Sequence, residues 1–274
     1  MNGLIEKYEK LKEYLASFGS VAVAFSGGVD STFLLYAARD ALGDNVIAVT
    51  ALTCLFPERE IEEAKEYCRN LNVRHYFANI DVFGIDGFTQ NPINRCYICK
   101  REILKKIREA AKSQNIREVI EGSNLDDNGD YRPGFLAITE LEIKSPFRHI
   151  GFTKQEIRDL SEHFSIPTWN KPSYACLASR IPYGEVISEE KLNMIDRAEQ
   201  LLHDMGFYQN RVRIHGDVAR IELLPEDFSH FMEPEIRFTV NKKFKEYGFA
   251  YIALDILGYR TGSMNETKIR GGLI

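Results

Sequence analysis

The residues that point most directly to chemistry form one glycine-rich loop, Ser26-Gly27-Gly28-Val29-Asp30-Ser31. The loop follows a short apolar run that predicts a buried strand, and it precedes a helical pattern that continues to about Leu42. A glycine pair in this position lets backbone N–H groups approach a phosphate, and the start of a helix adds partial positive charge. The hydroxyl groups of both serines can donate further hydrogen bonds. The loop therefore predicts a phosphate site.

Two familiar kinds of nucleotide loop do not fit these residues. The loop lacks the Gly-Lys-Ser/Thr ending of a Walker motif and the three glycines of a dinucleotide fingerprint, which argues against kinase-type and nicotinamide binding. The alternative that stays open is a glycine turn with an ordinary helix cap.

Three of the five cysteines are spaced for metal chemistry. Cys96 and Cys99 are separated by two residues at the predicted start of a helix, and Cys176 lies in an irregular stretch further along the chain. Three thiolates leave one iron of a four-iron cluster open to an external ligand such as hydrosulfide. Zinc, a redox pair at Cys96 and Cys99, and no metal are the alternatives. Cys54 and Cys68 are interpreted as packing residues.

The elements that must position these groups alternate along the chain. We expect strands at 20–25, 45–52, 73–80 and 118–122, with helices at 58–71 and 96–112 as well as after the loop. This order predicts an α/β fold with a doubly wound parallel sheet. Residues 126–134 are interpreted as a functional loop, and Thr153 with Glu156 predicts a capping box for a helix that ends near residue 164.

A smaller α+β domain is predicted at the C-terminus, with a boundary near residue 186, so that the domains are 1–186 and 187–274. A helical pattern over 192–205 precedes two alternating segments about Gly216-Asp217, a turn of the kind that closes a β-hairpin. A helix at 234–247 and a strand at 249–256 follow. Arg211 and Arg213 fall on one face of the first hairpin strand, where paired guanidinium groups suit a phosphate or carboxylate. An exposed charged strand face is the alternative.

Composition excludes several classes of protein. The net charge of −5 argues against a long nucleic acid as partner. The N-terminal residues alternate charged and apolar types, unlike a signal peptide, and no apolar run reaches membrane-spanning length. An odd number of unevenly spaced cysteines does not indicate a secreted disulfide framework. We therefore expect a cytoplasmic protein with no membrane and no nucleic acid partner.

The glycine-rich loop resembles the PP-loop of the N-type ATP pyrophosphatases, whose domains are adenine nucleotide alpha hydrolase-like. The resemblance implies that ATP binds with its pyrophosphate leaving group on residues 26–31 and that Asp30 assists Mg²⁺ and the phosphates. From about Val21 to Asn265 the chain is similar to the LarE family of sulfur transferases. The segments that carry this similarity are Asp130-Tyr131-Arg132-Pro133-Gly134, Trp169-Asn170-Lys171-Pro172, Ala175-Cys176-Leu177-Ala178-Ser179-Arg180-Ile181-Pro182-Tyr183-Gly184 and Arg211-Val212-Arg213-Ile214-His215.

The LarE resemblance implies a reaction in nickel-pincer nucleotide cofactor synthesis. A carboxylate of pyridinium-3,5-biscarboxylic acid mononucleotide attacks the α-phosphate of ATP, and sulfur then displaces AMP to leave a thiocarboxylate. One branch of the family sacrifices the sulfur of the cysteine that matches Cys176. Another has the additional pair seen here as Cys96 and Cys99, and the resemblance to it implies a [4Fe-4S] cluster on these three cysteines with a bound sulfide. Because this chain has the pair, we expect it to belong to the branch that uses a cluster.

The same resemblance implies roles for charged residues. Arg211 and Arg213 would bind the substrate's phosphate, and Arg180 near Cys176 would steady the adenylate or the substrate, unless it is a solvated loop residue. Glu199 and Glu222 match two metal-binding carboxylates, but His230 takes the third acidic position, and surface charge is the alternative for both glutamates. The family forms homo-oligomers, which we also expect here.

Three rival functions share parts of this pattern. A tRNA thiolase can share both the loop and the three cysteines. An amide-forming synthetase would use ammonia and would give the cysteines no role. A non-catalytic nucleotide-binding regulator would release no pyrophosphate.

Overall fold

The structure is a computed structural model that describes residues 2–129, 134–172, 175–260 and 262–265. Contacts divide the chain into two compact units, residues 1–88 with 94–174 and residues 89–93 with 175–274. This division places Cys176 and Arg180 in the second unit and leaves the functional boundary near residue 186 as a prediction. None of the described helices combines the length and the apolar character that a membrane span needs.

The first unit is built on a parallel sheet whose strands are β1 (Val21–Ala24), β2 (Val46–Leu52), β3 (Arg74–Asn79) and β4 (Glu118–Ile120). Their order is β3-β2-β1-β4, and β1 pairs in parallel with both β2 and β4. This order confirms the predicted doubly wound arrangement, because the chain crosses from one side of β1 to the other between β3 and β4. Ligands in such sheets bind beyond the carboxyl ends of the strands at this switch point.

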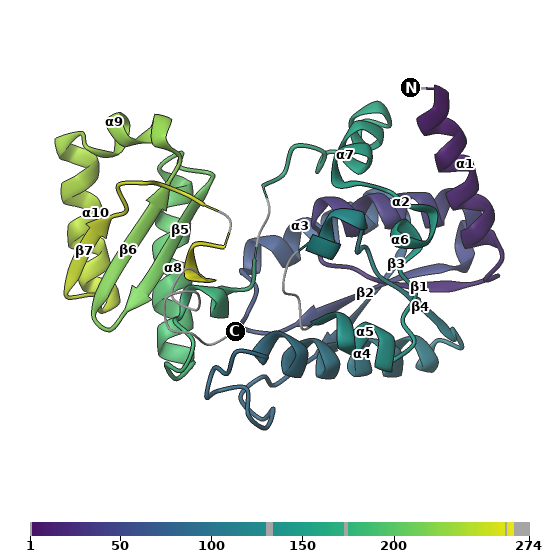
Figure 1. Ribbon diagram of the computed structural model, residues 1–274, viewed down its shortest axis with the longest axis horizontal. Coiled ribbons are helices and arrows are strands. Elements are labelled where there is room, and N and C mark those ends of the chain that lie inside the picture. The colour runs from purple at the N-terminus through teal and green to yellow at the C-terminus, as the bar shows by residue number, and fades with distance from the viewer. Residues whose placement is uncertain (1, 130–133, 173–174, 261, 266–274) are drawn as a thin grey trace. The chain divides into compact units, whose positions relative to one another are not determined.

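Helices cover both faces of this sheet (Figure 1). They are α1 (Asn2–Ala16), α2 (Val29–Leu42), α3 (Glu58–Asn70), α4 (Arg95–Ser113), α5 (Gly134–Glu140), α6 (Pro146–Ile150) and α7 (Lys154–His163), with 3-10 helices η1 (Gly43–Asn45) and η2 (Leu125–Gly129). Val21 and Val23 of β1 join one apolar core with Phe33 of α2, whereas Ala22 joins the other with Leu104 of α4. Alternating side chains thus bury β1 on both faces, as its apolar run predicts.

The second unit is a small α+β assembly with a mixed sheet. Its strands are β5 (Asn210–His215), β6 (Val218–Leu223) and β7 (Tyr251–Leu254), and its helices are α8 (Glu189–Asp204), α9 (Phe228–Phe231) and α10 (Pro234–Tyr247), with 3-10 helices η3 (Leu177–Arg180), η4 (Pro225–Asp227) and η5 (Ser263–Asn265). β5 and β6 form the predicted hairpin about Gly216, whose φ of 56° suits a tight turn. β7 pairs with β6 in parallel.

Three sequence interpretations need correction or fall outside the described residues. Cys54, interpreted as a packing residue, is exposed in the turn after β2, so it contributes nothing to the core. The predicted loop at 126–134 overlaps η2, which begins one residue earlier at Leu125, and includes the first residue of α5. Residues 130–133, which carry one of the segments similar to the LarE family, lie outside the described residues.

Candidate functional site

The phosphate loop, residues 26–31, joins the carboxyl end of β1 to α2 and is held by its own hydrogen bonds. Ser31 Oγ donates to Gly28 O at 3.2 Å and accepts from Ser26 N at 3.2 Å. Because the single hydroxyl proton of Ser31 is used on Gly28, Ser26 Oγ must donate in the 3.0 Å contact between the two hydroxyls. Gly28 is the N-cap of α2 and provides no side-chain cap. The loop is therefore held in shape by its own hydrogen bonds. The amino end of α2, which carries partial positive charge, lies within it.

Two glycines allow the close packing around this loop. Gly27 has a φ of +70°, and a Cβ there would lie 3.3 Å from Ala64 Cβ of α3. Gly122 follows β4, and a Cβ on it would lie 3.1 Å from both the backbone carbon of Asp30 and Ser31 N. The chain after β4 thus passes directly against the start of α2, as expected at the switch point.

The carboxylate of Asp30 is held by two residues that sequence reasoning did not identify. Lys154 Nζ forms an ion pair with Asp30 Oδ2 at 2.5 Å, and Asn124 Nδ2 donates to Oδ1 at 3.2 Å. Signals for both were present in the sequence. Asn124 lies just past the strand that neighbours β1, and Lys154 is the first residue of α7, where Thr153 and Glu156 form the predicted capping box.

Lys171 is a third residue that sequence reasoning did not assign to the site. Its Nζ donates to Gly27 O at 3.2 Å and lies 2.6 Å from carboxylate oxygens of both Glu60 and Glu63. Burial acts to lower the pKa of Lys171, but the two carboxylates outweigh it and raise the pKa above its usual value. Lys171 therefore stays charged and ties the first glycine of the loop to α3.

The cysteines predicted as metal ligands belong to different units. Cys96 and Cys99 lie in the first two turns of α4, Cys96 exposed and Cys99 buried, whereas the half-buried Cys176 immediately precedes η3. Within the part of the chain that the structure describes, no group of three or more His, Cys, Asp or Glu residues is arranged to hold a metal ion. The metal-ligand assignments stay predictions. Cys68 is 1% exposed, and burial raises the pKa of its thiol to about 12, as suits a packing residue.

Charged residues of the second unit lie on the face of the mixed sheet opposite its apolar core. Val212 and Ile214 of β5 are in that core, so alternation places Arg211 and Arg213 on the other face, opposite Glu222 and Arg220 of β6. Arg213 binds Glu222 Oε2 at 3.0 Å, and Ser263 Oγ donates to Glu222 Oε1 at 2.6 Å. These side chains form a network rather than a set of solvated charges.

The burial of these residues contradicts the alternatives of an exposed strand face, surface charges and a solvated loop residue. The exposed fractions are 1% for Arg180, 1% for Glu199, 0% for Glu222, 2% for Arg211 and 6% for Arg213. None is a surface charge: Arg180 pairs with Glu199, Tyr259 lies against Arg211, and Ser263 donates to Glu222. Glu199 and Glu222 both bind arginines here, and a metal role for them stays a prediction. His230 is exposed on α9 and lies 3.1 Å from Glu233.

Arg211 is a buried arginine whose pKa is lowered by its surroundings. Burial, and then the nearby charge of Arg180, lower its pKa to about 10, so that it is still protonated at neutral pH. Its guanidinium carbon lies 5.3 Å from the centre of the Tyr259 ring, and Nη1 donates to Asn210 O at 2.6 Å. Arg180 and Arg213 are paired with the carboxylates of Glu199 and Glu222, and the binding of a substrate phosphate by Arg211 and Arg213 stays a prediction.

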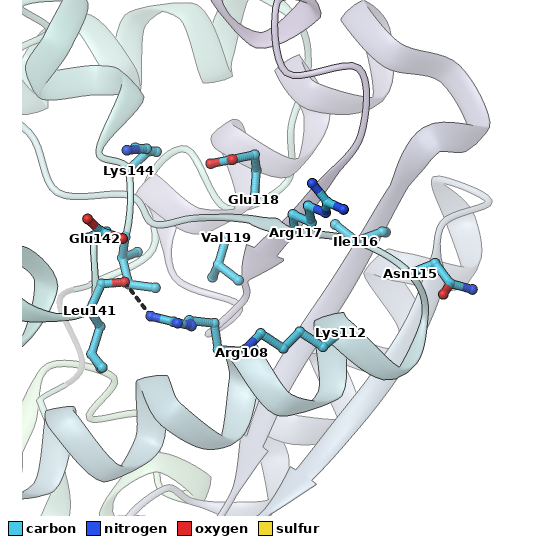
Figure 2. Close-up of a pocket in the computed structure, with 11 residues that line it drawn as sticks. Arg108, Lys112, Asn115, Ile116, Arg117, Glu118, Val119, Leu141, Glu142 and Lys144 are labelled. Carbon is cyan, nitrogen blue, oxygen red and sulfur yellow. Dashed lines mark hydrogen bonds between the residues drawn. The ribbon is translucent and has the colours of Figure 1, made fainter.

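A cavity of about 560 Å³ lies at the amino end of β4, an edge strand of the parallel sheet. Arg108, Lys112, Arg117 and Lys144 line it together with Glu118 and Glu142 (Figure 2). Glu118 begins β4, whereas the phosphate loop follows the opposite end of the neighbouring strand. The cavity is therefore separate from the predicted nucleotide site.

Comparisons with known proteins agree with this geometry. The family model described as NAD synthase matches residues 4–120. An uncharacterized protein of Synechocystis is 38% identical over 96% of this chain and 98% of its own length. The pyridinium-3,5-bisthiocarboxylic acid mononucleotide synthase of Lactiplantibacillus plantarum is 33% identical over 100% of this chain and 99% of its own. An uncharacterized protein of Methanocaldococcus jannaschii is 29% identical over 95% of each chain.

Proposed function

Because this chain belongs to the family of the pyridinium-3,5-bisthiocarboxylic acid mononucleotide synthase, the LarE family, we propose that it converts a carboxylate of pyridinium-3,5-biscarboxylic acid mononucleotide to a thiocarboxylate. It is an ATP-dependent enzyme of the ATP pyrophosphatase superfamily. The observation that carries the proposal is the full-length match to a synthase together with the pre-shaped phosphate loop at the switch point of the sheet.

The first half of the proposed reaction uses the phosphate loop. A substrate carboxylate oxygen attacks the α-phosphorus of ATP, the bond to the β-phosphate oxygen breaks, and pyrophosphate leaves with that electron pair. Backbone N–H groups of residues 26–31 and the start of α2 stabilise the departing charge. Asp30 would hold Mg²⁺, which neutralises charge on the phosphates. The product is an acyl adenylate.

The second half replaces AMP by sulfur. A sulfur nucleophile attacks the acyl carbon, and AMP leaves with the carbon–oxygen bonding pair. Arg180, Arg211 and Arg213 are proposed to hold the substrate, with Arg211 and Arg213 on its phosphate, because buried guanidinium groups bind phosphate oxygens with directed hydrogen bonds.

For the source of sulfur, the proposal is a [4Fe-4S] cluster held by Cys96, Cys99 and Cys176, which would supply sulfide when bound. The helical spacing of Cys96 and Cys99 at the start of α4 supports a shared metal centre. Direct sacrifice of the Cys176 sulfur is the competing route, and it needs only the one cysteine.

The first half of the proposed reaction, the formation of the acyl adenylate, is tested by incubating the protein with ATP, Mg²⁺ and the dicarboxylate mononucleotide. AMP and pyrophosphate are expected in equal amounts, and only when the mononucleotide is present. Formation of ADP would contradict the proposal. Ammonia offered in place of sulfide tests for an amide-forming synthetase, which would yield an amide product.

The source of the sulfur is tested by anaerobic purification, iron and sulfide analysis, and mass spectrometry of the protein after turnover. Retained iron with unchanged protein mass supports the cluster. Loss of one sulfur at Cys176 without iron supports sacrifice. Cys96→Ser and Cys99→Ser are expected to lose iron, whereas Cys54→Ser, at an exposed cysteine outside the set, is expected to retain it. Light scattering of the same samples tests the expected homo-oligomer.

A further inference from the structure

A short piece of the chain between β3 and α4, residues 89–93, packs with the second unit rather than the first. We call these residues the strap. Two backbone hydrogen bonds attach the strap. Gly184 N donates to Asn91 O, and Ile187 N donates to Thr89 O, each at 2.9 Å. The strap is therefore joined at two points to the chain that follows η3.

Asn91 fastens the strap through its side chain as well. It is 0% exposed, and its amide Nδ2 donates to Ile181 O at 3.3 Å and to Pro182 O at 2.6 Å. Both amide protons are thus used on two successive carbonyls. The backbone φ of Asn91 is 53°, in the left-handed region that asparagine adopts more readily than most residues. Asparagine therefore suits this position through both its side chain and its backbone.

The carbonyls that Asn91 binds belong to the segment that carries Cys176. This segment contains only η3, a 3-10 helix of four residues, which is too short to hold its own position. Arg180 ties the segment to α8 through Glu199, and Asn91 ties the two residues that follow Arg180 to the strap. The backbone after Cys176 is therefore fixed by two sets of side-chain hydrogen bonds.

We infer that Asn91 is a positioning residue for Cys176. The strap keeps the Cys176 thiol where sulfur enters the activated substrate, so that the acyl adenylate meets sulfur before water. Attack by water on the acyl carbon would return the carboxylate and release AMP without product. Asn91 acts only through the backbone that it binds. The inference rests on the proposed function, and it holds for either source of sulfur, since both use Cys176.

The test uses Asn91→Asp, which has nearly the same shape but a carboxylate that cannot donate to the two carbonyls. Asn91→Gly is the second variant, because glycine adopts the same φ without strain and removes the amide. The matched control is Asn72→Asp. Asn72 has the same φ of 53°, but it is exposed in the turn after α3.

Three quantities are measured on the full chain. The first is the rate at which iodoacetamide labels Cys176 in reduced, chelator-treated protein, followed by peptide mass spectrometry with the exposed Cys54 as the reference. The second is the yield of thiocarboxylate per pyrophosphate from ATP, Mg²⁺, sulfide and the dicarboxylate mononucleotide. The third is the affinity for α,β-methylene-ATP with Mg²⁺, measured by calorimetry. This analogue cannot be cut at the bond in question, and it reports the phosphate loop.

Asn91→Asp should label Cys176 about tenfold faster relative to Cys54, because the loss of two hydrogen bonds lets the segment open locally. Its yield of thiocarboxylate per pyrophosphate should fall about tenfold, since water then competes for the acyl adenylate. Asn91→Gly should change both quantities in the same direction, and Asn72→Asp should change neither. The ATP analogue should bind equally well to the wild type and to every variant.

Wild-type labelling and yield in both Asn91 variants would overturn the inference. Weaker binding of the analogue in step with the fall in yield would also overturn it, because Asn91 would then support the fold as a whole. A wild-type protein that forms no thiocarboxylate, while Asn91→Asp still speeds the labelling of Cys176, would overturn the proposed function and leave the placement of Cys176 by Asn91 supported.

Discussion

Arg180 and Glu199 form a doubly hydrogen-bonded ion pair inside the second unit, with Nε to Oε1 at 2.8 Å and Nη2 to Oε2 at 2.9 Å. Burial acts to raise the pKa of Glu199, but the Arg180 guanidinium outweighs it and leaves that pKa below its usual value. Arg180 Nη1 also donates to Cys176 O at 3.1 Å. The pair therefore anchors the segment that carries Cys176 to α8.

Removing either partner should destabilise the protein strongly. Arg180→Ala or Glu199→Ala leaves a buried charge without its counterion, which costs about 3–5 kcal/mol of unfolding free energy. Urea denaturation of the full chain, followed by circular dichroism, measures the loss. The fluorescence of Trp169, the single tryptophan, reports the first unit and should shift less.

The matched control is the exposed pair of Lys243 with Glu246 on α10. Lys243→Ala should leave the urea midpoint unchanged, since solvent screens exposed pairs. Equal midpoints for Lys243→Ala and Arg180→Ala would show that the buried pair contributes no more than a surface pair.

Stability should fall between pH 6.5 and pH 4 because of His75. Burial lowers its pKa from 6.5 to about 4. The hydroxyl of Thr50 donates to Phe25 O, so His75 Nε2 must donate to Thr50, and the buried Nδ1 has no hydrogen-bond partner among the described residues. In this window the unfolded chain binds a proton that the folded chain does not, so acid favours unfolding.

His75→Asn should flatten this part of the curve of unfolding free energy against pH. Imidazole titration by nuclear magnetic resonance checks the cause directly. A His75 pKa near 6.5 in the folded protein would contradict it.

Gly122→Ala should damage nucleotide binding. Its new methyl group would lie 3.1 Å from the backbone of Asp30, so the start of α2 or the chain after β4 must shift. Overpacking of this kind costs about 1–3 kcal/mol, and the displaced loop should bind α,β-methylene-ATP about tenfold more weakly. Calorimetry measures the affinity.

Gly3→Ala is the control for this substitution, because a Cβ there has no neighbour within 4 Å. It should leave analogue affinity unchanged. Wild-type affinity in Gly122→Ala would show that the close approach of β4 does not shape the loop.

Arg211→Gln should weaken recognition of the substrate's phosphate. The wild-type enzyme should prefer the dicarboxylate mononucleotide to the nucleoside without phosphate, and the variant should lose at least about tenfold of that preference in kcat/KM. Steady-state pyrophosphate release with both substrates gives the comparison. An unchanged preference would place the phosphate elsewhere.

The sequence by itself determined the order of strands and helices and the position of the phosphate loop. Apolar runs such as Val21–Ala24 and the hairpin turn at Gly216 are local signals, because periodicity and turn geometry depend on neighbouring residues. Short helices such as α6 and α9 gave no such signal, since they are too short to show a helical period and depend on packing.

Only the tertiary structure decided which charges meet. Lys154 is far from Asp30 in the sequence, and Arg180, Glu199 and Glu222 carry no local mark that separates a buried ion from a solvated one. Their burial depends on partners brought together by the sheet and its covering segments, because a charge is stable in the interior only beside its counterion.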